Sequence, residues 1–202
     1  MKKKIIYQFK IELLGIEPSI WRLIEVPSNY SFWDLHVAIQ DSMGWLDYHL
    51  HSFSLLPPGE KRPVLIGIPD DEYENNTLPG WDVPLYKYFI EPGDQANYDY
   101  DFGDDWRHRI VLKGIFPPKD GIKYPNCSDG QRACPPEDCG SVPGYYNLVE
   151  VLANTEHAEY KDMVYWLSNH AKNYHPYDPE KFEPDQVKFW NPKKRWKMAF
   201  ED

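Results

Sequence analysis

The sequence contains no run of apolar residues approaching the roughly 20 that a membrane-spanning helix needs. Its basic first four residues are followed by alternating apolar and polar residues, whereas a secretory signal would continue with an apolar stretch. Cysteine is also scarce. Cys127, Cys134 and Cys139 are an odd number, which suits a reduced compartment better than a disulfide framework. We therefore expect a cytoplasmic protein that makes no membrane contact.

Positive charge is in deficit, because 22 Lys and Arg residues face 32 Asp and Glu residues, for a net charge of −10 at pH 7. Proteins that bind nucleic acid rely on cations that displace the counterions of the phosphates. The basic run at 193–197 could form a local patch, but a solvated chain end explains it as well. The composition therefore favours a protein or small-molecule partner and disfavours nucleic acid.

Several catalytic signatures are absent too. The sequence has no Gly-x-Ser-x-Gly elbow, no phosphate-binding loop and no dinucleotide fingerprint. Residues 101–103 spell the Asp-Phe-Gly triplet of protein kinases, but the other kinase signatures are missing. Neither hydride transfer nor nucleotide hydrolysis is supported.

What the sequence does have is enough apolar surface for one core, with 42% hydrophobic residues in a chain of 202. Patterns of period two and of helical spacing, together with turn residues, predict an α+β fold. We predict a single domain over residues 1–202, with its core at about 5–190 and a mixed or antiparallel sheet on which C-terminal helices pack. The expected strands are 5–13, 20–26, 49–56, 64–68, 98–102 and 106–115, with a helix at 31–43, a short helix at 83–90 and two helices after Gly144. The expected loops are 69–84 and an irregular segment rich in proline and cysteine, 117–143.

The densest polar cluster lies at residues 99–108, around the turn of the last predicted hairpin. Asp99 and Asp101 share one side of a strand and Asp104 follows at the turn, so their carboxylates could hold a hard cation or act as a general base. The alternative is an acidic turn that satisfies its own amides and pairs with nearby arginines.

His49 and His51 stand two residues apart in a predicted strand, which would place both imidazoles on one face. Such a pair is half of a metal site, and the aspartate hairpin could complete it. Structural histidines that hydrogen-bond within the fold are the alternative.

The three cysteines of the 117–143 segment offer a second set of metal ligands. Three thiolates with a histidine from elsewhere, such as His108 or His157, could bind zinc and order the loop. The spacing lacks a Cys-x-x-Cys pair, so reduced thiols without metal are the alternative.

Four stretches of the sequence resemble the plasmid pRiA4b ORF-3-like family, in chain order and over roughly residues 5–190. They are residues 15–22 (Gly-Ile-Glu-Pro-Ser-Ile-Trp-Arg), 43–53 with its Met-Gly-Trp and His-Leu-His-Ser-Phe, 100–108 (Tyr-Asp-Phe-Gly-Asp-Asp-Trp-Arg-His) and 133–140 (Ala-Cys-Pro-Pro-Glu-Asp-Cys-Gly). The resemblance implies the family fold and directs attention to the residues within these stretches. Some relatives are labelled resolvase-like or insertion-element passengers, although no serine nucleophile with an arginine cluster supports recombination here.

These observations favour a binding or interaction domain that is not an enzyme, with a groove between the aspartate hairpin and the proline- and cysteine-rich loop. A metal-dependent hydrolase or nuclease-like enzyme with a His/Asp site is one alternative, and an accessory protein of mobile genetic elements is another. The candidate groove residues are Trp45, His49, His51, Asp101, Asp104, Asp105, Trp106, Arg107, His108, Glu137 and Asp138.

Overall fold

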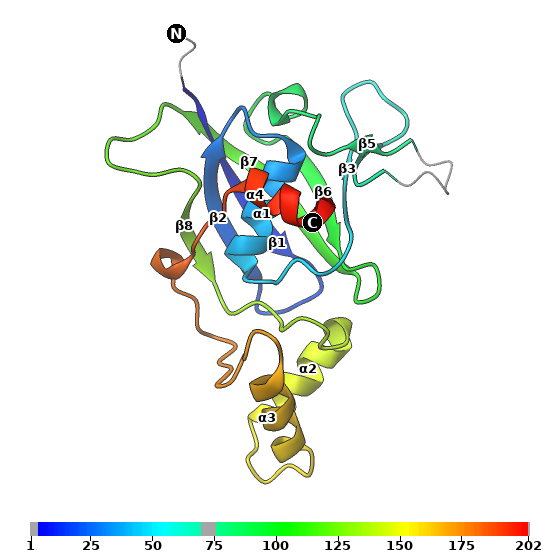
Figure 1. Cartoon of the computed structure of the whole chain (residues 1–202), viewed down its shortest axis with the longest axis vertical. Coiled ribbons are helices and arrows are strands. Elements are labelled where there is room, and N and C mark those ends of the chain that lie inside the picture. The colour runs from blue at the N-terminus through cyan, green and yellow to red at the C-terminus, as the bar shows by residue number, and fades with distance from the viewer. Residues whose placement is uncertain (1–3, 70–75, 202) are drawn as a thin grey trace.

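The computed structural model describes residues 4–69 and 76–201, and its framework is one eight-stranded sheet with α1 and α4 in front of it (Figure 1). The strands are β1 (Ile6–Leu13), β2 (Ile20–Pro27), β3 (His51–Leu55), β4 (Val64–Gly67), β5 (Leu78–Pro79), β6 (Gln95–Tyr100), β7 (Trp106–Phe116) and β8 (Asn126–Gln131). The helices are α1 (Phe32–Met43), α2 (Ser141–Leu152), α3 (Tyr160–Asn169) and α4 (Pro192–Phe200), with 3₁₀ turns η1 (Leu85–Lys87) and η2 (Pro184–Gln186).

The strand order is β5-β4-β3-β6-β7-β1-β2-β8. Neighbouring strands run antiparallel except β4 and β5, which are parallel, so the sheet is mixed and the predicted α+β class is confirmed. Alternate residues of the central strands are fully buried, as their period-two pattern predicted. No helix in the part of the chain described here is long and apolar enough to cross a bilayer.

Helix α1 begins where the sequence indicated. The Ser31 hydroxyl accepts from the Asp34 amide and the Asp34 carboxylate accepts from the Ser31 amide, which is the expected capping box. The helix ends at Gly44, whose φ of 89° is in the left-handed region. The apolar face of α1 packs on the sheet, where the Phe32 and Phe53 rings lie 5.1 Å apart between centroids.

The remaining helices occupy two places. Helices α2 and α3 lie together beyond one end of the sheet (Figure 1). Helix α4 packs on α1, where the Arg195 guanidinium bonds to the Asp41 and Asp47 carboxylates at 2.9 and 3.0 Å. The basic run expected as a solvated end thus lies within helix α4, and its arginine is bound to the fold, a contact that periodicity cannot reveal.

The segment 117–143 is less irregular than expected, because β8 forms within it and pairs with β2. Its residues include Asn126, Ser128, Asp129 and Gly130, which have low strand propensity. The unpaired edge of β2 supplies the hydrogen-bonding partner that the local sequence does not predict. Residues 70–75 of the loop predicted at 69–84 lie outside the described residues.

Candidate metal centre

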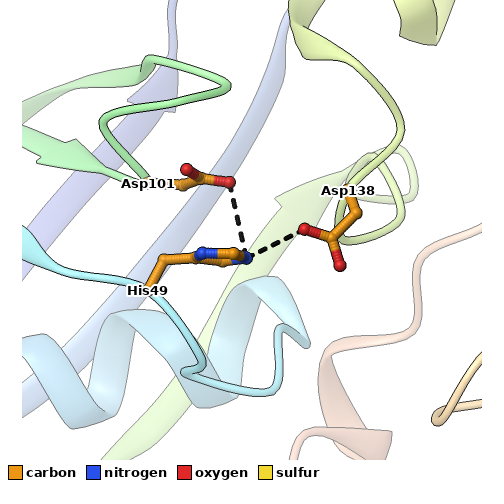
Figure 2. A group of neighbouring side chains, drawn as sticks. All are labelled: His49, Asp101 and Asp138. Atoms are coloured by element: carbon orange, nitrogen blue, oxygen red, sulfur yellow. Dashed lines mark hydrogen bonds and ion pairs between the residues drawn. The ribbon is translucent and has the colours of Figure 1, made fainter.

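Three side chains from distant parts of the chain meet beside the turn of the β6–β7 hairpin (Figure 2). His49 precedes β3, Asp101 directly follows β6, and Asp138 lies in the loop before α2. The His49 Nε2 atom is 3.0 Å from Asp138 Oδ1 and 3.5 Å from Asp101 Oδ2. One ligand atom from each residue lies within 4.8 Å of the other two, so the three donors face a common point.

The two aspartates are held by unusual backbone conformations. Asp101 has a φ of 55° and Asp138 a φ of 57°, a region in which aspartate is tolerated better than most residues. The Asp101 Oδ1 atom accepts from the amides of Gly103 and Asp104 at 2.9 and 3.2 Å. Its other oxygen, Oδ2, is thereby directed to His49.

Glu137 anchors the loop that carries Asp138. Its side chain is fully buried, and Oε1 accepts from the Leu46 amide at 2.6 Å and from the Tyr100 hydroxyl at 3.0 Å. The second oxygen, Oε2, lies 3.9 Å from His49 Nε2. Burial raises the pKa of the Glu137 carboxyl above its ordinary value. The buried carboxylate therefore fixes the loop while adding negative potential behind the imidazole.

Two further bonds hold the same loop against its neighbours. The Asp104 carboxylate accepts from the Gly140 amide at 3.1 Å, which ties the hairpin turn to the start of α2. The Trp45 indole donates to the Pro135 carbonyl at 2.9 Å. The hairpin turn and the proline- and cysteine-rich loop are therefore in contact.

Trp45, His51, Trp106 and His108, all predicted groove residues, are buried among core side chains instead. The Trp45 ring lies against Trp106 and His108, with centroids 6.1 and 5.4 Å away, and His51 stacks on His36 with ring centroids 3.5 Å apart. The predicted shared face of His49 and His51 fails because β3 begins at His51, so the strand alternation does not extend back to His49. Burial lowers the pKa of His51 well below its ordinary value and that of His108 to about 4, so both are neutral at pH 7.

Asp105 and Arg107 form an ion pair with each other at the exposed hairpin. The ligand group that contains His49 does not include either residue. Of Asp101, Asp104 and Asp105, Asp101 alone belongs to the group that could hold a metal ion, while Asp104 bonds to the adjoining loop.

The three cysteines do not gather into a ligand group among residues 4–69 and 76–201, where the one group of three or more possible ligands is that of His49. Cys127 lies on β8, and Cys134 and Cys139 lie in the loop before α2. Burial raises the pKa of Cys127 to about 11 and that of Cys134 to about 12. Protonated, enclosed thiols are poor metal ligands and poor nucleophiles.

Sequence reasoning missed the residues that support the loop. Tyr100 and Tyr174 bond to the Glu137 carboxylate and amide, and His170 Nε2 lies 3.8 Å from Asp138 Oδ2. Only Tyr100 lies within a stretch that the sequence singled out, residues 99–108, and it was not named there as a support of the loop. His170 and Tyr174, which follow α3, carry no local signal that points to the loop.

The comparisons with known proteins agree with this fold. The family model described as plasmid pRiA4b ORF-3-like protein matches residues 5–186. The chain is similar to the uncharacterized protein y4hQ of Sinorhizobium fredii, with 32% identity over 165 residues that cover 81% of each protein. It is also similar to the crystal structure of protein of unknown function MM3350 from Methanosarcina mazei Go1, with 42% identity and a TM-score of 0.81, over 93% of this chain and 100% of that chain.

Proposed function

Because this chain belongs to the plasmid pRiA4b ORF-3-like family, whose compared relatives carry names that state no activity, we propose a function from the geometry: a binding domain that holds one divalent metal ion through His49, Asp101 and Asp138. The observation that supports it is the convergence of an imidazole and two carboxylates from three separate segments. Imidazole nitrogen and carboxylate oxygen together suit zinc, manganese or ferrous iron.

The two separations that involve His49 fit one ion. Donors about 2.1 Å from a metal lie roughly 3.0–3.5 Å apart in octahedral or tetrahedral arrangements. The His49 nitrogen is 3.0 and 3.5 Å from its two carboxylate oxygens, within that span. A protonated imidazole that forms ion pairs with both carboxylates is the alternative, and metal binding separates the two.

The surroundings favour a ligand larger than the ion alone. Tyr48 and Leu50 flank His49, Phe102 follows Asp101, and all three side chains are exposed. Exposed apolar side chains gathered next to polar donors are typical of a binding surface. The metal would then serve as the fixed polar point of a site whose rim contacts the partner.

Metal analysis tests the proposal. Tag-free protein stripped with chelator should bind one equivalent of Zn²⁺ or Mn²⁺ in a calorimetric titration, and His49→Gln should lower the affinity at least tenfold. Asp105→Asn is the matched control on the same hairpin, and Cys134→Ser is the control for a thiolate site. Both should bind as the unchanged protein does. Absence of stoichiometric binding, or its loss in Cys134→Ser alone, would refute the centre.

A metal-dependent hydrolase is the second candidate, favoured by the openness of the site. Three protein ligands leave coordination positions for water, as in catalytic zinc sites. The Asp138 side chain is 53% exposed and that of His49 30%, so solvent reaches the donors. Metal-loaded protein should then hydrolyse an activated phosphodiester or ester, and His49→Gln should abolish that rate. If the loaded protein binds metal without turnover, the binding function stands alone.

A further inference from the structure

A cavity of about 380 Å³ lies where the end of α1 meets the loop after β8 and the segment that leads to α4. Its volume is within the range of small-molecule sites. None of the three ligands of the metal centre lines it. The sequence stretch 15–22, which the metal centre does not use, ends at Arg22, and Arg22 lines this cavity. The cavity is therefore a separate candidate site.

Arg22 is a buried cation whose guanidinium keeps one nitrogen free. The residue is 1% exposed. Its Nε donates to the Ser42 carbonyl at 2.9 Å, and Nη1 donates to the Trp21 and Gln131 carbonyls at 2.8 and 3.0 Å. The Phe182 ring centroid lies 3.6 Å from Cζ. In the described parts of the chain Nη2 has no hydrogen-bond partner, yet it is not sealed from solvent, so its N–H groups can bond a ligand in the cavity.

Among residues 4–69 and 76–201, no carboxylate forms an ion pair with Arg22. The ionisable groups that face it are Cys127, Cys134 and Tyr177. Burial raises the pKa of Cys127 to about 11, that of Cys134 to about 12 and that of Tyr177 well above its ordinary value, so all three are neutral at pH 7. A buried cation without a counter-charge is costly, and a bound anion would remove part of that cost.

The end of α1 offsets only part of the positive charge. The C-terminus of a helix carries about −0.5 elementary charge. Two cations share it, because Arg22 bonds to the Ser42 carbonyl and the Lys172 ammonium to the Gly44 carbonyl. Lys172 lines the same cavity and also faces the Glu137 carboxylate. The local balance therefore stays positive, by less than two charges.

The acidic residues of the cavity do not cancel this excess. Asp41 already forms an ion pair with α4. Asp178 and Glu183 are exposed, and the exposed Lys181 and Lys188 match them in number. Water and salt screen such exposed charges, whereas they screen the buried guanidinium much less.

Much of the remaining wall is apolar. It includes Met43 from the end of α1, Pro135 from the loop after β8, and Pro176 and Val187 from the segment that leads to α4. This surface suits a short alkyl chain, and an inorganic anion alone would leave it without a partner.

We propose that the cavity at the end of α1 binds a small carboxylic acid as its anion, with the carboxylate at Arg22 Nη2 and Lys172 Nζ and the alkyl chain against Met43 and Val187. A carboxylate offers two oxygens to the two donors. Its single charge matches the small positive excess better than a phosphate dianion does. The proposal goes beyond metal binding and does not rest on it, because neither cation belongs to the ligand group of His49.

Calorimetry with sodium hexanoate tests the proposal. Hexan-1-ol is the uncharged probe of equal chain length, and inorganic phosphate is the anion without an alkyl chain. We expect saturable binding of hexanoate to the full-length protein, none of the alcohol, and at least tenfold weaker binding of phosphate. Arg22→Gln should weaken hexanoate binding at least tenfold and Lys172→Met at least fivefold. Lys161→Met is the matched control and should bind as the unchanged protein does, because Lys161 is exposed on α3 and does not line the cavity.

The outcomes separate this site from the metal centre. His49→Gln should keep hexanoate binding and lose metal, whereas Lys172→Met should weaken hexanoate binding and keep metal. Equal binding of the alcohol, tighter binding of phosphate, an equal loss in Lys161→Met, or no saturable heat with hexanoate would overturn the proposal. Circular dichroism checks the fold of Arg22→Gln. If that variant does not fold, Lys172→Met decides, because the Lys172 side chain is exposed and its replacement leaves the core intact.

Discussion

Replacing Glu137 with alanine should destabilise the protein by about 3 kcal/mol, because the change leaves two buried donors without an acceptor. The Leu46 amide, which is partly buried, and the buried Tyr100 hydroxyl both bond to this carboxylate, whose own side chain is fully buried. A buried unsatisfied donor costs about 1–3 kcal/mol, so the pair costs roughly 2–6. Part of this cost is offset in the alanine variant. Burial raises the pKa of Glu137, which means that the native fold bears the cost of a desolvated carboxylate, and the alanine variant no longer bears it.

Equilibrium unfolding in urea at pH 7, followed by tryptophan fluorescence, measures the effect. Glu137→Gln keeps an acceptor oxygen and no charge, so it should cost less than half as much as the alanine. Tyr100→Phe combined with Glu137→Ala should show a coupling of about 1 kcal/mol or more, since the two side chains are bonded. The exposed Glu60→Ala is the control and should change the free energy of unfolding by less than about 0.5 kcal/mol.

The Glu137 variants also test whether the anchoring of the loop affects metal binding. Glu137→Ala should also weaken metal binding, because the loop that positions Asp138 loses its anchor, while Glu137→Gln should largely retain it. The reasoning fails if the alanine costs less than about 1 kcal/mol, or if glutamine and alanine cost the same. Either result would mean that the loop is held by other contacts.

Two further predictions concern pH and α4. Burial lowers the pKa of His108 to about 4, so between pH 6.5 and 4 the unfolded chain takes up a proton that the native chain does not. His108 should therefore contribute a loss of about 3 kcal/mol over that window on acidification, and His108→Gln should make the measured fall smaller, without abolishing it, in urea titrations at pH 7 and 4.5, because His51 contributes to the same window. Arg195→Leu leaves the Asp41 and Asp47 carboxylates buried without their cation, at a cost of about 2–4 kcal/mol. It should expose α4 to trypsin earlier than the solvent-exposed Lys194→Ala does, and equal digestion of the two would contradict the contact.

The sequence predicted best the elements that short-range chemistry specifies. The Ser31–Asp34 capping box and the left-handed Gly44 lie within the segment they delimit, so the bounds of α1 followed from local rules. The β6–β7 hairpin followed from its turn residues in the same way. Strand β8 did not, because its pairing depends on the edge of β2, about a hundred residues earlier.

The same distinction between local patterns and contacts of distant segments applies to the residues of the candidate site. His49 and Asp101 were named as partners because each is a metal-ligand residue near a predicted strand end, and the register of β3 on β6 brings those ends together. His51 was placed with them because the strand was expected to begin earlier than it does. The part played by Glu137 depends on the backbone of Leu46 and on Tyr100, contacts between distant segments that no single stretch of sequence reports.

The three donors of the metal centre lie at positions 49, 101 and 138, so they share no neighbourhood until the sheet and its loop are complete. An unfolded chain would hold such a constellation only fleetingly, and an ion would therefore select the finished architecture. By mass action, an ion present at 100 times its dissociation constant would add about 2.7 kcal/mol to the native state. Metal binding would then stabilise the folded state, and the stability of the protein would depend on the concentration of metal around it.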